Sequence, residues 1–157
     1  MESREAADDG LVVLKREDGE AFVVVTRPFA AGTVIRRFSA EQTLAAPTWL
    51  TVQTGPDQHI QLSPSHLRRI NHSCEPNVFF DTDELAIIAL REIAVGDELT
   101  FFYPSTEWDM AQPFVCGCGT KSCLGTIRGA RHIEAQQLDR FKLNSHVKRM
   151  LAAPANS

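Results

Sequence analysis

Short runs of apolar residues, separated by turn-forming residues, dominate the first hundred positions of this chain. Such runs are typical of β-strands. The first two, at 11–15 and 21–26, flank Asp18-Gly19, a dipeptide that favours a hairpin with a tight two-residue turn. The same pattern predicts five more strands, at 33–38, 59–62, 78–80, 85–90 and 99–103.

Residues 39–56 do not follow this pattern, because Pro47, Gly55 and Pro56 interrupt it. Proline lacks a backbone N–H and glycine favours turns, so both weaken a strand prediction. We therefore expect a loop with one helical turn in this segment. Trp49, which lies within it, is expected to fill the core, since large aromatic side chains mostly serve packing.

The last part of the chain has a different period. Apolar residues at helical spacing predict two short helices, at 134–141 and 145–151, with Asn144 as the N-cap of the second. We expect both helices to pack over the cysteine-rich segment that precedes them. At the other end, residues 1–10 are charged and polar, which predicts a frayed leader.

Composition indicates one globular domain. A chain of 157 residues can bury about 70% of its unfolded surface, enough for a single core. The hydrophobic content of 43% argues against disorder, and no apolar run is long enough for a membrane span. A net charge of −4 argues against direct nucleic-acid binding and suits a basic peptide partner. The sequence carries no signal for the oligomeric state.

The chain has four cysteines, and three of them form one run. Glycines beside this run let the backbone curl, so that several thiolates can face a common point. Zinc prefers four tetrahedral nitrogen or sulfur ligands, and the run therefore needs a fourth. With the remaining thiol, the expected structural zinc site consists of Cys74, Cys116, Cys118 and Cys123.

Two alternatives to this site remain. His72 or His132 could replace Cys74 as the fourth ligand. The four cysteines could also form two disulfides, but residues 1–10 do not resemble a secretory signal, and disulfides are rare in intracellular proteins. We therefore favour zinc and an intracellular location. No basic targeting run distinguishes the cytoplasm from the nucleus.

Three motifs together carry a family resemblance. Residues 71–77 (NHSCEPN) and 96–103 (GDELTFFY) resemble the two signatures of the SET-domain protein lysine methyltransferases. The cysteine run from Cys116, followed by 124–129 (LGTIRG), resembles the post-SET zinc segment of that family. The motifs occur in the family's order and spacing, and the resemblance spans about residues 11–130.

The resemblance implies a mostly β SET-domain fold of short sheets, with a threaded, pseudoknot-like central loop. A post-SET zinc segment and short C-terminal helices would complete it. This implies a leader at 1–10, a SET domain at 11–111, a post-SET zinc segment at 112–129 and a C-terminal helical extension at 130–157.

The resemblance also implies an activity, the transfer of a methyl group from S-adenosylmethionine to a lysine ε-amine. Tyr103, the only tyrosine, matches the catalytic tyrosine of the family, and Phe101 and Phe102 would line the lysine channel. Asn71, His72, Tyr103 and Leu124 match positions that contact the cofactor. The expected partner is a lysine-containing protein or peptide, with histones among the candidates. Because Phe101 lacks a hydroxyl, its position favours di- or trimethylation.

One departure supports a different function. The family usually has Gly-x-Gly near the first hairpin, whereas this chain has Gly19-Glu20-Ala21. The alternative is therefore a catalytically weak SET-like module that binds peptides and holds the cofactor poorly. A weaker alternative is a hydrolase that uses Cys74 or Ser73 with His72, although no nucleophile elbow surrounds these residues.

Overall fold

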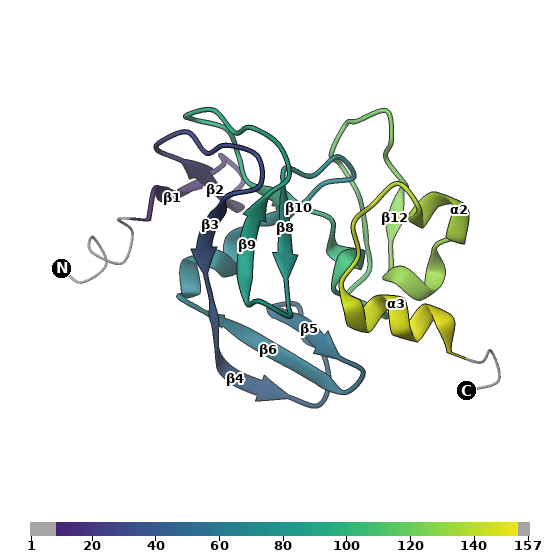
Figure 1. Ribbon diagram of the computed structural model, residues 1–157. Coiled ribbons are helices and arrows are strands. Elements are labelled where there is room, and N and C mark those ends of the chain that lie inside the picture. The colour runs from purple at the N-terminus through teal and green to yellow at the C-terminus, as the bar shows by residue number, and fades with distance from the viewer. Residues whose placement is uncertain (1–8, 154–157) are drawn as a thin grey trace.

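The computed structural model describes residues 9–153 (Figure 1). This part of the chain is mostly β, as predicted, with its strands arranged in several small sheets. The strands are β1 (Leu11–Lys15), β2 (Ala21–Val25), β3 (Val34–Arg37), β4 (Ser39–Leu44), β5 (Thr51–Gly55), β6 (Gln58–Ser63), β7 (Asn71–His72), β8 (Val78–Asp81), β9 (Ala86–Ala89), β10 (Thr100–Phe101), β11 (Phe114–Val115) and β12 (Thr126–Ile127). The helices are the 3₁₀ turns η1 (Ser65–Arg69), η2 (Tyr103–Ser105) and η3 (Ala130–His132), and the α-helices α2 (Ala135–Leu138) and α3 (Ser145–Ala152).

The chain opens with the predicted hairpin of β1 and β2, which pair in antiparallel register from Leu11↔Val25 to Lys15↔Ala21. The expected two-residue turn is wrong. Arg16 and Glu20 pair through their backbones, and the N–H of Gly19 donates to the carbonyl of Arg16, which leaves a three-residue loop. Gly19 has a φ of +91°, so the glycine supplies the left-handed residue that a three-residue hairpin needs.

Residues 1–8 of the predicted leader lie outside the described part of the chain. Asp9, which the same prediction included, is buried and joined to the domain. Its carboxylate accepts from the N–H of Leu11 and lies 2.8 Å from Nε2 of His66. Arg36 approaches the same carboxylate at 3.6 Å.

Two three-stranded sheets form the middle of the molecule, in the orders β3-β9-β8 and β4-β6-β5. The prediction of a loop at 39–56 is wrong, because this segment contains both edge strands of the second sheet. The sequence does not reveal these strands, because β4 is mostly polar and exposed, and β5 has Val52 as its only large apolar residue. An exposed edge strand needs no apolar alternation, so the hydrophobic pattern carries no sign of it.

A parallel pair of very short strands threads the chain through its centre. Thr100 of β10 pairs with Asn71 of β7, and Phe101 pairs with His72. Beyond the pair, the N–H of Ser73 donates to Phe101 O at 3.1 Å and the N–H of Asn77 donates to Thr100 O at 3.1 Å. The two signature motifs therefore lie edge to edge, which is the predicted threaded arrangement.

The main core lies between the small sheets and contains buried side chains from most of them, including Val23, Leu62, Phe80 and Leu99. Trp49, which we expected in the core, is 64% exposed. It lies in the turn between β4 and β5, two strands that were themselves not foreseen. The packing prediction was wrong because it considered only the type of residue and not its position relative to the strands.

A second, smaller core joins the C-terminal helices to the rest of the domain. It consists of Phe102, Ala130, Leu138, Leu143 and Val147, with Trp108, Leu124, Ile133 and Phe141 packed against it. Both α-helices lie on the same side of the molecule as β12 (Figure 1). The helices were predicted correctly in kind, although α2 covers only four residues.

Asn144 occupies the predicted N-cap position of α3, but its side chain makes no capping hydrogen bond. It donates instead to the carbonyls of Phe80 at 2.8 Å and Ser105 at 3.0 Å, and accepts from the N–H of Thr82 at 2.9 Å. This buried amide ties the end of β8 to the turn that follows Tyr103.

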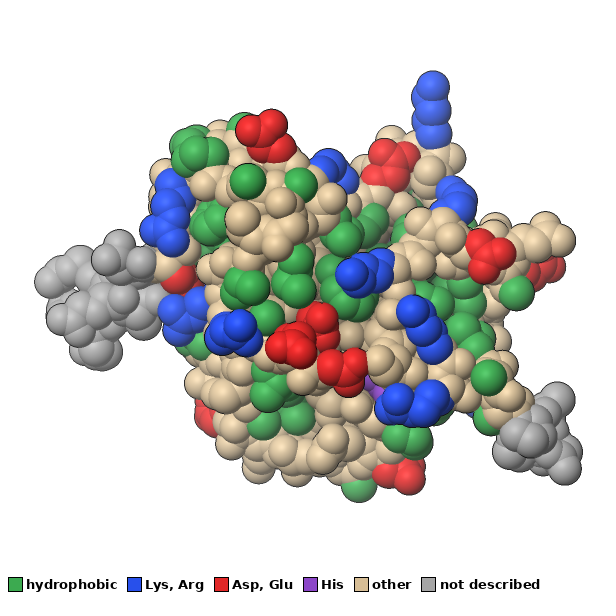
Figure 2. Space-filling model, in the orientation of Figure 1, with side chains coloured by type: hydrophobic (Ala, Val, Ile, Leu, Met, Phe, Trp, Pro, Cys, Tyr) green, Lys and Arg blue, Asp and Glu red, His purple; other side chains and the backbone are tan. Residues whose placement is uncertain are grey.

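On the face shown in Figure 2, Lys and Arg side chains are interspersed with Asp and Glu. Charges of both signs therefore cover this face, in keeping with the small net charge of −4. Among the described helices, none combines the length and the apolar character that crossing a membrane requires.

Candidate functional site

A cavity of about 1020 Å³ opens beside the parallel pair. Asn71 and His72 of β7, Phe101 of β10 and Tyr103 of η2 all line it. Four of the residues predicted from the two signature motifs thus share one cavity. Cys116 and Cys118 of the cysteine run border it as well.

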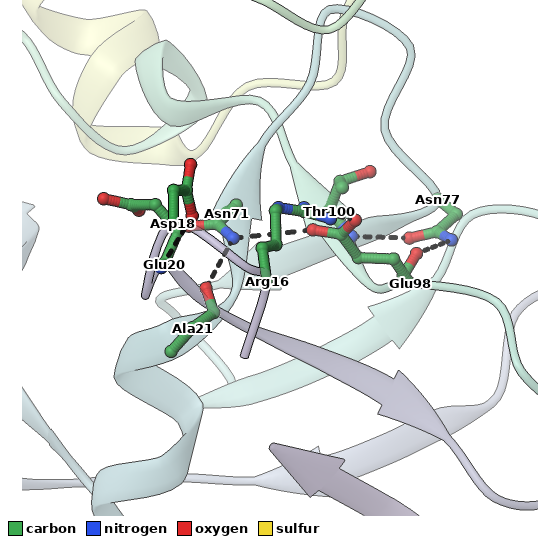
Figure 3. Close-up of polar contacts among 8 residues, drawn as sticks. All are labelled: Arg16, Asp18, Glu20, Ala21, Asn71, Asn77, Glu98 and Thr100. Atoms are coloured by element: carbon green, nitrogen blue, oxygen red, sulfur yellow. Dashed lines mark hydrogen bonds and ion pairs between the residues drawn. The ribbon is translucent and has the colours of Figure 1, made fainter. Parts of the chain in front are cut away.

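The Asn71 side chain is fixed by the backbone of the first hairpin. Its Nδ2 donates to Ala21 O at 2.9 Å and lies 3.5 Å from Oε2 of Glu98 (Figure 3). Glu98 in turn forms an ion pair with Arg16 at 2.8 Å. Arg16, Ala21 and Glu98 line the cavity, so this polar network forms part of its wall.

Asn77 holds the second motif from the other side. Its Nδ2 donates to Glu98 O at 2.9 Å, and its Oδ1 accepts from the N–H of Thr100 at 2.9 Å (Figure 3). Both groups of the amide are therefore used to fix the strand that leads to Phe101. This explains why asparagine ends the first motif.

His72 stands between the tyrosine and the cysteines. Its Nδ1 accepts from the N–H of Tyr103 at 3.1 Å, and its Nε2 lies 3.4 Å from Sγ of Cys74. Burial lowers the pKa of His72 to about 4, so the ring is neutral at pH 7. A neutral ring that accepts at Nδ1 carries its proton at Nε2 and donates toward the sulfur.

Tyr103 is packed among aromatic rings at the cavity wall. Its ring lies 4.7 Å from that of Phe101 and 5.2 Å from that of His72, between centroids. Its hydroxyl lies 3.4 Å from the carbonyl oxygen of Ile70. Burial raises the pKa of the phenol above its usual value, so the hydroxyl stays protonated and can donate a hydrogen bond at neutral pH.

The four cysteines converge as predicted. All four Sγ atoms lie within 4.8 Å of one another, with 4.0 Å between Cys74 and Cys116. Four sulfurs bound to zinc at about 2.3 Å would be about 3.8 Å apart, so the cluster fits a tetrahedral zinc site. None of the four cysteines forms a disulfide, and the convergence of all four sulfurs on one point favours the metal site over two disulfides.

The histidine alternatives for the fourth ligand do not fit the cluster. Nε2 of His132 contacts Asp109 Oδ1 at 2.9 Å, away from the sulfurs. His72 contacts Cys74 itself, as a neighbour of the cluster.

Two predicted site residues lie elsewhere. Phe102 is 2% exposed and stacks on Phe141, with 3.6 Å between ring centroids, so its side chain belongs to the second core. Leu124 also packs against that core, while its N–H donates to Cys74 Sγ at 3.3 Å. Neither is among the residues that line the cavity.

Other residues of the cavity wall were not foreseen. Glu107 and Thr51 are buried polar residues that line it, and exposed Trp49 lies at the same wall. Glu98 could have been found, because it lies within the second motif. Glu107 follows that motif, and no pattern in the sequence marks it.

A threaded β-fold that places an Asn-His pair, one tyrosine and a four-cysteine cluster around one cavity defines the SET-domain class. The SET domain family model matches residues 20–104, and the chain belongs to this family.

Curated relatives agree with this assignment. Methyltransferase flvH of Aspergillus flavus is 48% identical over 124 residues, which cover 78% of this chain and 69% of that protein. The H3 lysine-36 specific histone-lysine N-methyltransferase of Schizosaccharomyces pombe is 40% identical over 91 residues, or 54% of this chain and 11% of that protein. Human histone-lysine N-methyltransferase 2B is 42% identical over 62 residues, or 36% of this chain and 2% of that protein. The two histone-lysine enzymes are thus far longer than the region they share with this chain.

The fold matches a solved structure, KRYPTONITE in complex with mCHH DNA, an H3(1–15) peptide and SAH. The TM-score is 0.56 at 23% identity, and the match covers 74% of this chain and 29% of that one. This likeness shows the SET fold.

Proposed function

We propose that this protein is a protein-lysine N-methyltransferase that uses S-adenosylmethionine. The observation that carries the proposal is the single cavity lined by Asn71, His72, Phe101 and Tyr103. Membership of the SET family and the names of the relatives, which include histone-lysine N-methyltransferases, support it. The proposed substrate is a lysine of a protein or peptide, with histones as first candidates, inside the cell.

S-adenosylmethionine supplies a methyl group bound to a positively charged sulfur. Asn71 and His72 would hold this cofactor at the hairpin end of the cavity, near Ala21. The Tyr103 hydroxyl would hydrogen-bond near the reacting groups and align the attack. We keep Leu124 as a candidate support for the cofactor through its backbone contact with Cys74.

The acceptor amine must be neutral when it attacks. A free lysine has a pKa of about 10.4, so deprotonation at pH 7 costs about 4.6 kcal/mol. Apolar residues of the cavity wall, Leu62, Leu67, Ile70 and Phe101, would lower that pKa by desolvation. Phe101 presents a bare phenyl ring at this wall, which supports di- or trimethylation.

We also propose that the four cysteines bind one structural zinc ion. Cys74 follows β7, whereas the other three ligands follow β11, so the ion would join two distant segments next to the cavity. Loss of the ion would release the segment that contains Cys116 and Cys118 from the cavity wall.

Calorimetric titration of zinc-loaded protein with S-adenosylmethionine tests the proposal first. We expect binding in the micromolar range, about 8 kcal/mol. Incubation with methyl-labelled cofactor and core histones should then place label on lysine. Absence of cofactor binding by protein with one zinc ion per chain would contradict the proposal.

A catalytically weak peptide-binding module is the second candidate. Ala21 favours it, because this residue lies at the cavity wall where the family usually has the second glycine of Gly-x-Gly. Ala21→Gly separates the two functions. Tighter cofactor binding in this variant, with little binding in the parent, would favour the module.

A further inference from the structure

Glu107 is the most enclosed acidic residue of the cavity. It is 7% exposed, whereas the other acidic residues that line the cavity, Asp18, Glu20 and Glu98, are half-buried or exposed. The backbone N–H of Glu107 donates to the carbonyl of Tyr103 at 2.9 Å. One turn of chain therefore presents both the tyrosine and this carboxylate to the same cavity.

Only one of the two carboxylate oxygens of Glu107 is used. Its Oε2 accepts from the N–H of Gln53 at 2.7 Å and from Oγ1 of Thr106 at 2.8 Å. Within residues 9–153, no group donates to Oε1. Yet Oε1 is not among the fully enclosed unpaired side-chain atoms of these residues, which are Arg36 Nε, His59 Nδ1 and Ser105 Oγ. Oε1 is therefore reached by solvent, and the residue that carries it lines the cavity.

No cation of the described chain pairs with this carboxylate. Three arginines line the same cavity, Arg16, Arg68 and Arg69, but none of them forms an ion pair with Glu107. Two titratable groups close to its turn, Tyr103 and His146, are neutral at pH 7. Burial raises the pKa of Tyr103, and burial lowers the pKa of His146, whose Nε2 donates to the carbonyl of Thr106 at 2.8 Å. Gln53, which contacts Glu107 from β5, carries no charge.

An acid in such surroundings is poorly solvated. Burial raises the pKa of Glu107 to about 7. A buried carboxylate without a cation is destabilising, and a ligand that brings a positive charge into the cavity would relieve this. An alkylammonium group is a ligand of this kind, because it couples an apolar chain to a compact charge.

We propose that Glu107 is the binding site for the acceptor amine, and that its Oε1 pairs with the ammonium group and takes one of its protons. This inference rests on the proposed function and adds a residue to it. The proton moves from the lysine nitrogen to Oε1, which leaves a neutral amine. The nitrogen lone pair forms a bond to the methyl carbon while the carbon–sulfur bond breaks, and that electron pair stays on sulfur. The nitrogen becomes the cation, and Glu107 returns its proton to solvent through the open cavity.

Binding of n-pentylammonium tests the subsite without an enzymatic assay. The zinc-loaded protein of 157 residues is titrated by NMR with n-pentylammonium chloride and, separately, with 1-pentanol, with and without S-adenosylhomocysteine. We expect Glu107→Gln to weaken n-pentylammonium binding by roughly tenfold or more and to leave 1-pentanol binding unchanged. The glutamine keeps an acceptor oxygen for Gln53 and Thr106, so the fold is retained.

Two further variants separate charge from structure. Thr106→Val removes one hydrogen bond to the carboxylate and keeps the charge, so n-pentylammonium binding should persist. Glu92→Gln removes an exposed charge outside the cavity and should change nothing. Equal n-pentylammonium affinity of the parent and Glu107→Gln, or no binding by the parent, would overturn the proposal. Binding of S-adenosylmethionine is measured in the same samples. If the cofactor does not bind while n-pentylammonium does, the methyltransferase proposal is contradicted and the amine subsite is not.

Discussion

The backbone N–H of Tyr103 donates to Nδ1 of His72, whose other ring nitrogen lies 3.4 Å from Sγ of Cys74. One neutral imidazole therefore connects the turn of the tyrosine to the cysteine cluster. The ring belongs to the first sequence motif, and it links the second motif to the cluster through Cys74. A change at His72 should disturb both.

His72→Phe tests this connection. The phenyl ring keeps the aromatic packing but leaves the N–H of Tyr103 without an acceptor, which should lower the free energy of unfolding by about 1–3 kcal/mol. Urea unfolding measures the loss. The control is His132→Phe, which replaces a more exposed histidine paired with Asp109 and should cost less than about 1 kcal/mol. If both variants lose the same free energy of unfolding, the hydrogen bonds of His72 add little to stability and the ring acts through its packing.

Tyr103→Phe removes the hydroxyl and keeps the ring. The hydroxyl contacts Ile70 O at a long 3.4 Å, so stability should change little. Turnover should fall by roughly 10²-fold or more, because a preorganised hydrogen bond is lost. Single-turnover methyl transfer and calorimetric cofactor binding measure the two effects. An unchanged rate would remove Tyr103 from the mechanism.

Cys123→Ser should abolish stoichiometric zinc binding. One of four thiolates is lost, and the binding energy of a structural zinc ion contributes directly to folding. Elemental analysis and thermal unfolding should show less metal and a lower melting temperature, with Ser122→Ala as the neighbouring control. A parent protein that is fully stable without metal would count against the zinc site.

Asn144→Ala should destabilise the domain strongly. The buried amide serves the carbonyls of Phe80 and Ser105 and the N–H of Thr82, and alanine leaves all three without this partner. We expect a loss of roughly 3 kcal/mol or more in denaturant unfolding. The control Ser145→Ala, at the half-buried start of α3, removes a single hydrogen bond to Asp83 and should cost about 1 kcal/mol or less. A loss below 1 kcal/mol would mean that water replaces the amide at little cost.

The pH dependence of stability should change in Glu107→Gln. The pKa of Glu107 is about 7 in the folded chain and near 4.5 when unfolded, so the folded state binds more protons between these values. The stability that protonated Glu107 contributes is therefore fully present below pH 4.5. It is lost as the pH rises through 7, and the free energy of unfolding falls by up to about 3 kcal/mol.

Urea unfolding of the parent and of Glu107→Gln at pH 5 and pH 8 measures this effect. The variant should gain stability relative to the parent at the higher pH. Curves that stay parallel would show that the pKa of Glu107 is nearly the same in the folded and unfolded chain, so that the carboxylate is well solvated or compensated in the fold.

The residues that sequence reasoning placed correctly are those in local motifs. The spacing of Cys116, Cys118 and Cys123 and the pattern NHSCEPN each reflect chemistry that a short stretch must satisfy, and the cysteines and the Asn-His pair are found together. The strands with apolar alternation, such as β2 and β8, were also visible. Their buried faces require apolar side chains, and the sequence shows this requirement directly.

The missed features depend on long-range partners. β4 is an exposed edge strand that only β6 defines, and Gln53 and Glu107 pair across 54 positions. Phe102 and Phe101 are adjacent and chemically alike, yet one faces the second core and the other the cavity. The alternation of side chains along a strand predicts that these two residues point to opposite sides. The sequence does not show which of the two sides lines the cavity.

The parallel pair of β7 and β10 has a consequence for how the cavity comes into existence. Parallel strands cannot be joined by a tight turn, and this pair brings together positions 71–72 and 100–101, with two strands of another sheet between them. Neither strand has a local nucleus from which to grow, so their pairing must wait for most of the domain to collapse. Amide hydrogens of Ser73 and Asn77, which donate across this seam, should then exchange only through global unfolding. The reactive centre would be among the last parts to assemble and among the slowest to open.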